Sequence, residues 1–419
     1  MQLHSANALQ LVIYLDLPDL MKNRLSDRIM QLAESETIAM AQRSRDLKAK
    51  GIDVINLSLG EPDFNTPDFI KEAAKKAIDN NITHYPPVAG FPELREAICR
   101  KFMRDNQLHY TPDQIVVSTG AKQSIMNAVL CLVNPGDEVV LPAPYWVSYR
   151  EMVRYAGGVE KVIPTHLEND YKITPEQLDD TLTERSRLFI FSSPSNPTGS
   201  AYTEEELRQL AEVFARYSQV TVISDEIYEH IRYTGSHFSI ARIDDLSDRV
   251  ITVNGVSKAF AMTGWRIGYL AATPEVAKAC IKIQGQFTSG ASSISQMASL
   301  AAVEADPMEV KYMVDAFAER RKTVVDKVSK IPGFECNRPD GAFYLFPRID
   351  KLLNKNSPEG RITTSSDLCM YLLSEAHVAT VSGSAFGADD CIRLSYATST
   401  EVLNEAIDRI GIAVEKLKP

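Results

Sequence analysis

The chain has 419 residues and a formal net charge of -10, with acidic and basic residues interspersed along it. This length allows two or three lobes, or one large α/β domain with a smaller companion. The acidic balance argues against partners such as nucleic acid or an anionic membrane, so we expect small molecules and a second copy of the chain as partners.

The cysteines and the first residues indicate no metal and no membrane segment. Six cysteines are scattered without a Cys-x-x-Cys pair, and no histidines stand at metal-ligand spacing. We therefore expect structural thiols, no metal site and a reducing, cytoplasmic location. The apolar run 8–15 lacks a basic flank and is too short to span a bilayer. We interpret residues 1–27 as an irregular N-terminal extension.

The first predicted elements are a helix over 29–49 and a short buried strand over 54–59. The strand ends at Gly60, which would allow a ligand to approach the backbone closely. An ordinary strand-to-turn glycine is an equally good interpretation of Gly60 alone.

The next segment predicts a helix and then an irregular loop. Thr66 and Pro67 indicate a helix start, with Thr66 as the N-cap and the proline at the first helical position. The loop over 83–90 presents Tyr85. A lone loop tyrosine is expected to pack its ring and expose its hydroxyl.

A candidate anion site follows the strand over 115–118. Gly120 makes a turn before an apolar helix that runs through Val133. The free N–H groups and the dipole of a helix N-terminus attract anions, although a glycine at such a turn can serve packing alone. Trp146 then follows a strand over 138–141, at a strand end where α/β folds place ligands. Packing between helix and sheet is the alternative for Trp146.

Polar residues collect at the ends of two further strands. The strand over 188–192 leads into a turn in which two prolines flank Asn196, and Thr203 and Glu206 form a capping box for the next helix. The strand over 220–224 delivers Asp225 and Tyr228. Because an unpaired buried carboxylate is costly, we interpret Asp225 as functional.

The segment after the strand over 250–253 carries two cations, Lys258 and Arg266, among small and apolar residues. Loss of water from an ammonium lowers its pKa, so Lys258 is a candidate nucleophile. A lysine that lays its stem along apolar surface is the alternative. Residues 267–272 are interpreted as an edge strand.

The alternation of strands and helices predicts an α/β fold. We expect a large domain over 61–300, with a mostly parallel sheet covered by helices on both faces. Residues 28–60 and 301–419 are predicted to form a smaller α+β domain. That domain is expected to contain strands over 341–346 and 391–396 and a last helix that begins at Glu401.

A lysine, an anion site and an aspartate at strand ends together suit pyridoxal phosphate. From about Arg28 onward the chain resembles the fold-type I aminotransferases of class I, most closely the bacterial aspartate aminotransferase subgroup. Several ordered motifs carry the resemblance: Gly-Glu-Pro-Asp-Phe, Asn-Pro-Thr-Gly, Ser-Asp-Glu-Ile-Tyr and Ser-Lys-Ala-Phe-Ala-Met-Thr-Gly-Trp-Arg. The order and spacing of these motifs favour Lys258 as a nucleophile over a lysine that lays its stem along apolar surface.

The resemblance implies a site that binds pyridoxal 5'-phosphate. The catalytic residues would be Lys258, which binds the cofactor aldehyde and then moves protons, Asp225, which pairs with the pyridine nitrogen, and Tyr228. The residues implied to bind the cofactor are Gly120, Ala121, Trp146, Asn196, Asp225, Tyr228, Ser257, Lys258 and Arg266, with Tyr85 from a neighbouring subunit. The residues implied to bind the substrate are Gly60, Lys122, Trp146, Asn196 and Arg393.

The resemblance also implies the reaction, which is reversible amino transfer between L-aspartate and 2-oxoglutarate in two half-reactions by a homodimer. Lys122 stands where the animal and enteric enzymes have a small residue, and is expected to bind the distal carboxylate. No partner-subunit arginine for that task is identifiable in the sequence.

Several other functions share parts of this pattern. An aminotransferase for aromatic amino acids, alanine or prephenate, or a β-lyase, would have the same fold and cofactor. A noncatalytic regulator that binds pyridoxal phosphate should carry a basic DNA-binding domain, which is not found here. A dinucleotide-binding dehydrogenase should show Gly-x-Gly-x-x-Gly, whereas Gly120 stands alone.

Overall fold

A computed structural model describes residues 25–419, so the apolar run 8–15 and most of the predicted extension lie outside the described residues. The expected helix over 29–49 is two helices, α2 (Asp27–Met30) and α3 (Glu36–Ala49). Ser35 has an extended backbone at the N-cap of α3. The Ser35 side chain makes no capping hydrogen bond, so the later start of α3 follows from this extended residue and not from a serine cap.

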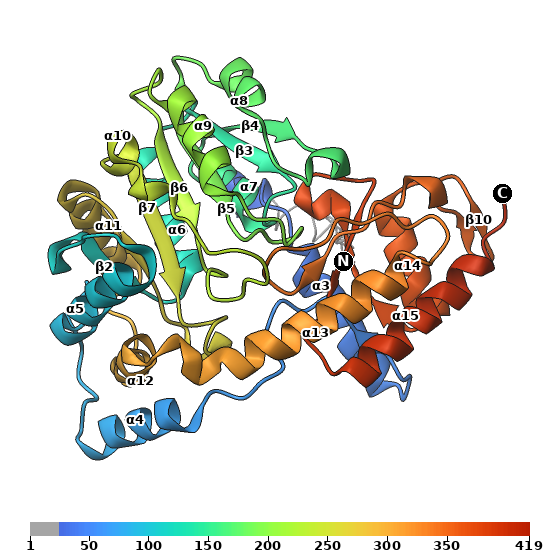
Figure 1. The fold of residues 1–419 in the computed structure, drawn as a ribbon, viewed down its shortest axis with the longest axis horizontal. Coiled ribbons are helices and arrows are strands. Elements are labelled where there is room, and N and C mark those ends of the chain that lie inside the picture. The colour runs from blue at the N-terminus through green and yellow to red at the C-terminus, as the bar shows by residue number, and fades with distance from the viewer. Residues whose placement is uncertain (1–24) are drawn as a thin grey trace, which may run out of the picture.

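A seven-stranded sheet forms the centre of the larger part of the molecule (Figure 1). Its strand order is β2-β8-β7-β6-β5-β3-β4, and β8 is the one strand that runs antiparallel to its neighbours within the sheet. The predicted mostly parallel sheet is confirmed. The strands are β2 (Ile115–Ser118), β3 (Glu138–Ala143), β4 (Val159–Pro164), β5 (Ser186–Ser192), β6 (Thr221–Asp225), β7 (Val250–Gly255) and β8 (Gly268–Ala271).

The prediction that residues 267–272 form an edge strand is wrong. Strand β8 lies between β7 and β2 and pairs with both. The connection over 256–267 contains no long crossover helix, so β8 returns antiparallel beside β7, and its four residues are all buried. The strand β4, which the sequence pattern did not predict, forms an edge instead.

Alternate residues of the inner strands face two different cores. Val116 and Ile190 pack with helices α6, α7 and α11, whereas Val117 and Phe189 belong to the core on the opposite face, which includes residues of α5, α9 and α12. Both faces of the sheet are therefore covered, as a parallel sheet requires. The bounds are α5 (Pro92–Lys101), α6 (Ala121–Leu132), α7 (Ser148–Tyr155), α9 (Glu204–Phe214), α11 (Pro274–Phe287) and α12 (Ser293–Glu304).

Three further helices flank this part of the chain: α4 (Asp68–Asp79), α8 (Pro175–Thr181) and α10 (Asp244–Ser247). The capping box predicted at Thr203 is present at the start of α9. Thr66 does not cap α4. Its hydroxyl donates to the Ala261 carbonyl and accepts from the Trp265 indole N–H, so it joins the α4 entry to the segment that follows Lys258.

The remaining elements combine the two ends of the described chain. Figure 1 shows α3 close to the orange and red C-terminal elements, and β1 (Ile55–Asn56) pairs with β12 (Val378–Ala379). A three-stranded sheet has the order β13-β14-β9, and β10 pairs with β11. These elements are α13 (Lys311–Val328), α14 (Ser365–Glu375), α15 (Thr400–Glu415), β9 (Tyr344–Leu345), β10 (Asn356–Ser357), β11 (Gly360–Arg361), β13 (Val381–Ser382) and β14 (Ile392–Ser395).

The division of the chain into domains at 60/61 and 300/301 stays a prediction.

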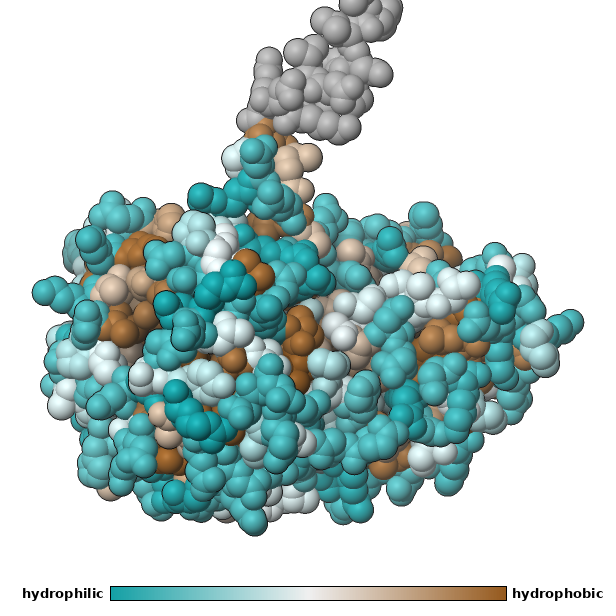
Figure 2. All heavy atoms as spheres, turned by 90° about the horizontal axis from the view of Figure 1, so that it is seen from above, coloured by the Kyte–Doolittle hydropathy of each residue, from teal (hydrophilic) through white to brown (hydrophobic). Residues whose placement is uncertain are grey.

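Figure 2 shows one face of the molecule, which is mostly hydrophilic with separate hydrophobic patches. Within residues 25–419, no helix has the length and apolar character needed to cross a membrane.

Gly268 provides a test of how the sheet places helix α6. A Cβ at Gly268 would lie 2.1 Å from the Ala121 nitrogen, whereas a Cβ at Gly264 would meet nothing within 4 Å. The obstacle at Gly268 is backbone and cannot rotate away. Gly268→Ala should therefore cost roughly 1–3 kcal/mol, the usual range for overpacking.

Thermal unfolding measures this difference. We expect Gly268→Ala to lower the melting temperature by about 3 °C or more, and Gly264→Ala to leave it near that of the wild type. Equal melting temperatures for the two variants would contradict the close approach of β8 to α6.

Candidate functional site

A cavity of about 330 Å³ opens at the carboxyl ends of the parallel strands. Asp225 ends β6, Ser257 and Lys258 follow β7, and the first residues of α6 complete one wall. The cavity brings together all predicted site residues except Gly120 and Tyr85. Those that line it are Gly60, Ala121, Lys122, Trp146, Asn196, Asp225, Tyr228, Ser257, Lys258, Arg266 and Arg393.

Lys258 lies in an apolar segment, as its neighbours predict. Val256, Phe260 and Met262 are buried, and the Lys258 ammonium donates a hydrogen bond to the Gly60 carbonyl oxygen. Burial lowers the pKa of Lys258 to about 8, and the positive charges of Arg393 and Arg266 add to the effect. A large fraction of this amine can therefore be neutral near pH 8.

The start of α6 forms a cradle suited to an anion. Gly120 has φ +85°, and a Cβ there would lie 2.3 Å from an Arg266 nitrogen, so only glycine lets this guanidinium come so close. Helix α6 begins at Ala121, whose N–H is one of the first N–H groups of the helix and has no partner four residues earlier. Ser257 also lines this cavity. The donors match a phosphate group.

Asp225 is buried at the end of β6 and accepts a hydrogen bond from the Tyr149 hydroxyl at 2.7 Å. The backbone N–H of Ile227 donates to its other oxygen at 3.3 Å. Burial raises the pKa of Asp225 to about 6, although the Tyr149 bond acts in the opposite direction. Tyr149 is not among the residues predicted from the sequence. The sequence signal that points to Tyr149 as a site residue is its position three residues after Trp146, facing the same strand ends.

Arg393 lies on β14 and is buried without a carboxylate partner among the described residues. Its two terminal nitrogens donate to the Asn196 side-chain oxygen at 2.9 Å and to the Ser58 carbonyl at 2.7 Å. Its Nε has no partner within residues 25–419. Burial lowers the pKa of Arg393. The guanidinium is thus held in place with N–H groups left for an anion.

Tyr228 and Tyr344 join the two parts of the site. Their hydroxyl oxygens are 2.7 Å apart, and both side chains line the cavity. The sequence pattern over 341–346 predicts a strand and gives no role to Tyr344. The sequence signal that points to Tyr344 as a site residue is its hydroxyl within an otherwise apolar buried strand.

Lys122 faces the cavity beside Trp146. Its Nζ lies 4.9 Å from the centroid of the Trp146 ring. Burial and the charge of Arg266 lower the pKa of Lys122. Trp146 in turn makes an edge-to-face contact with Tyr149, with ring centroids 5.4 Å apart.

The charges that line the cavity are unbalanced. Lys122, Lys258, Arg266 and Arg393 provide four cations, against the two carboxylates Glu61 and Asp225. None of the four cations forms an ion pair within 4 Å in the part of the chain that the structure describes; their contacts are with backbone carbonyls, an amide oxygen or an aromatic ring. This arrangement favours a ligand with several negative charges.

Tyr85 lies outside the cavity lining. It is 96% exposed, the highest value among the large exposed hydrophobic residues of the described chain. Its predicted contact with the cofactor of a neighbouring subunit stays a prediction.

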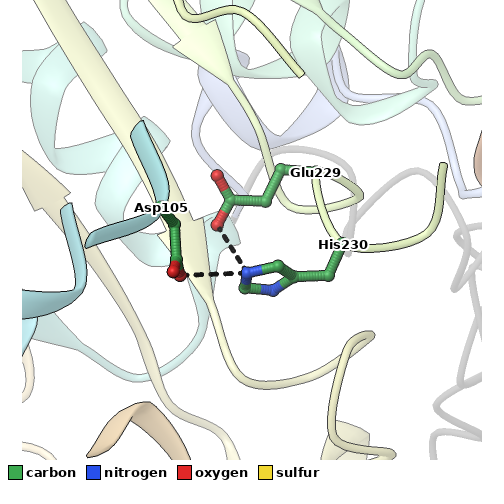
Figure 3. A group of neighbouring side chains, drawn as sticks. All are labelled: Asp105, Glu229 and His230. Carbon is green, nitrogen blue, oxygen red and sulfur yellow. Dashed lines mark hydrogen bonds and ion pairs between the residues drawn. The ribbon is translucent and has the colours of Figure 1, made fainter. Parts of the chain in front are cut away.

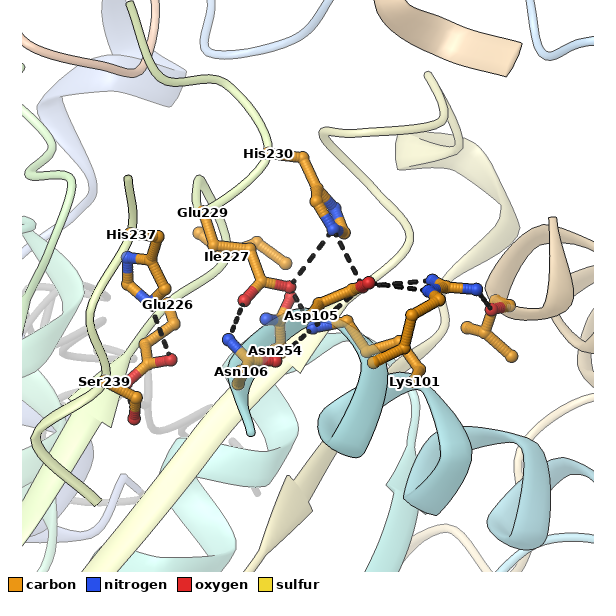
Figure 4. A network of polar contacts seen from close by, with 12 residues as sticks. Lys101, Asp105, Asn106, Glu226, Ile227, Glu229, His230, His237, Ser239 and Asn254 are labelled. Carbon is orange, nitrogen blue, oxygen red and sulfur yellow. Dashed lines mark hydrogen bonds and ion pairs between the residues drawn. The ribbon is translucent and has the colours of Figure 1, made fainter. Parts of the chain in front are cut away.

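A buried ionic network supports the turn that follows Asp225 (Figure 4). Glu229 contacts the Lys101 ammonium and accepts from the Asn106 amide at 2.5 Å. His230 lies 3.1 Å from Asp105 and 3.6 Å from Glu229. On the other side of the turn, Glu226 accepts from Ser224 and Ser239.

Figure 3 shows that Asp105, Glu229 and His230 point toward one another, as metal ligands do. The Lys101 ammonium already supplies a positive charge to this group, since it contacts Glu229 and lies 3.7 Å from Asp105. We therefore interpret the group as an internal ion-pair network. It fixes the turn that bears Tyr228.

Comparisons with known proteins agree with this geometry. The family described as "Aminotransferase class I and II" matches residues 52–410. A bifunctional aspartate aminotransferase and glutamate/aspartate-prephenate aminotransferase of Petunia hybrida is 50% identical, over 94% of this chain and 84% of its own length. An aspartate/prephenate aminotransferase of Cereibacter sphaeroides is 48% identical, over 92% of this chain and 97% of its own length.

Solved structures show the same fold. The aspartate aminotransferase of Rhizobium meliloti superimposes with a TM-score of 0.91 at 43% identity, covering 94% of this chain and 99% of its own. The aspartate aminotransferase of Thermus thermophilus with maleate has a TM-score of 0.87 at 40% identity, covering 93% and 99%.

The pKa of Lys258 can be measured directly in the cofactor-free protein. Because only a neutral amine reacts with an acylating reagent, the labelling rate of Lys258 should rise through a midpoint near pH 8 and then level off. Trace acetylation across a pH series, read by mass spectrometry of the peptides, gives this midpoint.

Lys75 is the internal control in the same samples. It is exposed, and its hydrogen bond with Glu72 raises its pKa above the ordinary value, so its labelling should keep rising after Lys258 has levelled off. Parallel curves for the two lysines would contradict the desolvation of Lys258.

Proposed function

The chain belongs to the class I and II aminotransferase family, and we propose that it transfers amino groups reversibly between L-aspartate and 2-oxoglutarate with pyridoxal 5'-phosphate as cofactor. One observation carries the proposal: a desolvated lysine, a buried aspartate and an anion cradle face one cavity that has an excess of positive charge. The names of the Petunia, Cereibacter, Rhizobium and Thermus proteins support aspartate as the substrate.

The residues present fit this cofactor. The Ala121 N–H, with Ser257 and Arg266, would hold the phosphate, and Lys258 would bind the aldehyde. The Gly120 N–H, predicted as a further donor, already donates to the Ser118 carbonyl at 2.8 Å. Asp225 would pair with the ring nitrogen, Trp146 would stack on the ring, and Asn196 and Tyr228 would bond its phenolic oxygen. When bound, pyridoxal phosphate supplies a conjugated ring that accepts the electrons released at the substrate α-carbon.

Lys258 is proposed to move the proton. Its lowered pKa keeps much of the amine neutral near pH 8, so it could take a proton from the substrate α-carbon and donate that proton to the carbon of the cofactor that would carry the amino group. In the protein without cofactor, the Gly60 carbonyl holds this amine at the cavity.

Arg393 is proposed to bind the α-carboxylate of the substrate. Asn196 and Ser58 fix the plane of its guanidinium, and the remaining N–H groups can form a bidentate pair with a carboxylate. Orientation by such a pair would place the α-carbon toward Lys258.

Lys122 is proposed to bind the distal carboxylate, which would select dicarboxylic substrates. It lines the same cavity as Arg393 and has no carboxylate within ion-pair distance among the described residues. The Thermus structure carries maleate, a dicarboxylate, which supports a dicarboxylic ligand for this fold.

A second candidate is amino transfer to prephenate. The names of the Petunia and Cereibacter relatives include this activity alongside aspartate, so the same chain can be expected to carry both. Those names give no support to a preference for aromatic amino acids or alanine, or to a noncatalytic regulator that binds pyridoxal phosphate.

We also propose a homodimer and a cytoplasmic location. A tyrosine as exposed as Tyr85 is suited to reach a site on a second copy of the chain. All six cysteines are free thiols, as is usual in a reducing compartment.

Steady-state kinetics with a panel of substrates tests the function. With 2-oxoglutarate as acceptor, aspartate should be a far better donor than alanine or phenylalanine, and glutamate with prephenate as acceptor tests the second candidate. Lys258→Ala should lose several orders of magnitude in kcat, because the proton-transfer group is removed, whereas the exposed-lysine control Lys75→Ala should match the wild type. Activity retained by Lys258→Ala would refute the proposal.

Lys122→Ala tests the dicarboxylate preference. A charge-assisted hydrogen bond is worth about 1.5–3 kcal/mol, so we expect kcat/KM for aspartate to fall roughly ten- to a hundredfold while that for alanine changes little. Cofactor affinity, measured by absorbance titration, should hold. An equal loss for every substrate together with weaker cofactor binding would place Lys122 at the phosphate instead.

A further inference from the structure

Tyr344 occupies the junction of three segments that supply the site. It lies on β9, where it pairs in register with Ser395 of β14, the strand that carries Arg393. Its side chain is fully buried and lines the cavity.

The hydroxyl of Tyr344 contacts the turn after β6. It lies 2.7 Å from the Tyr228 hydroxyl, and the two rings meet edge to face with centroids 5.7 Å apart. One of these O–H groups donates to the other. If Tyr344 donates, the proton of Tyr228 is left free to point into the cavity.

The ring of Tyr344 contacts the guanidinium of Arg393. The central carbon of Arg393 lies 4.6 Å from the Tyr344 ring centroid and 5.0 Å from that of Phe386. No carboxylate pairs with Arg393 in the described part of the chain. These two aromatic faces therefore compensate its buried charge.

Gly60 closes the same junction. A Cβ at Gly60 would lie 2.6 Å from the Tyr344 hydroxyl oxygen, so the loop and the phenol are in close contact. The carbonyl of Gly60 also accepts the hydrogen bond from Lys258. One side chain thus contacts the proposed carboxylate-binding arginine, the proposed cofactor-bonding tyrosine and the loop that holds the lysine.

We propose that Tyr344 is a positioning residue with two separable tasks: its hydroxyl donates to Tyr228 and directs the Tyr228 proton into the cavity, and its ring holds the Arg393 guanidinium in the plane that receives a carboxylate. This inference deepens the proposed function and rests on it. A phenol that accepts a hydrogen bond is a stronger donor through its own proton. Tyr228 would therefore stabilise negative charge on the phenolic oxygen of the bound cofactor better than an isolated tyrosine.

Two variants separate the tasks. Tyr344→Phe removes the hydroxyl and keeps the ring on Arg393, whereas Tyr344→Leu removes both. Tyr371→Phe is the matched control, because Tyr371 is also buried in the C-terminal part and its hydroxyl donates to the Ala413 carbonyl, away from the cavity. Melting temperatures of all three report the general cost of a lost buried hydroxyl.

The first readout is the pH midpoint of the visible absorption of the cofactor-loaded protein. Tyr344→Phe should raise this midpoint by roughly half a unit to one unit, the effect of one hydrogen bond, because the deprotonated form loses stabilisation. Besides Tyr344, the charged or titratable groups that face Tyr228 are Tyr149, Asp225, Lys258 and Arg393, and all four are kept in the variant. Tyr371→Phe should not move the midpoint.

The second readout is the affinity for succinate, a dicarboxylate that cannot react, by calorimetry. Tyr344→Phe should change the Kd less than about threefold, and Tyr344→Leu should weaken binding about tenfold, as expected for a lost cation–π contact.

The proposal is overturned if Tyr344→Phe titrates like the wild type, if Tyr371→Phe shifts the midpoint equally, or if Tyr344→Leu binds succinate as well as Tyr344→Phe. A wild-type protein without visible absorption after addition of pyridoxal phosphate would refute the proposed cofactor instead. The succinate comparison in that protein would still decide the role of the ring.

Discussion

Burial of positive charge without a carboxylate partner is the constraint on which the site depends. An ammonium or guanidinium removed from water is costly unless hydrogen bonds or another charge compensate it. Arg393 has only an amide oxygen, a backbone carbonyl and two aromatic rings around it among the described residues. Packing elsewhere in the fold must offset the cost of burying such groups. An anionic ligand can then form the ion pair that no carboxylate of the described residues forms with Arg393.

The sheet provides that stability and also gathers the chemistry. Because alternate residues such as Val116 and Val117 face two separate cores, the parallel strands are anchored on both sides. Their carboxyl ends then meet at one edge, where Asp225 and the segment that bears Lys258 arrive together. The small sheet adds Arg393 from residues far later in the chain. The order of the strands, more than any single local motif, brings these residues together at one cavity.

The sequence places Lys258, Asp225 and Asn196 at a site through short motifs, and the resemblance adds Arg393. All four residues line the cavity, and their roles stay proposals. The features that escape prediction depend on contacts across the fold. The interior place of β8 follows from a reversal of the chain, and the roles of Tyr149 and Tyr344 follow from hydroxyl contacts with residues 76 and 116 positions away. No local pattern encodes such partners, since a buried tyrosine is equally common in a core.

The two carboxylates Asp225 and Glu229 show how the fold assigns opposite tasks within five residues. Both are buried, which opposes ionisation. Around Glu229 the Lys101 ammonium, His230, His237 and the Asn106 amide together outweigh burial and lower the pKa to about 2, so this group is a fixed structural anion. Asp225 has a phenol and a backbone N–H but no cation in contact within residues 25–419, and its pKa rises to about 6. The carboxylate that faces the cavity is thus the one left without a cationic partner, and it has the most to gain from a protonated ring nitrogen placed beside it.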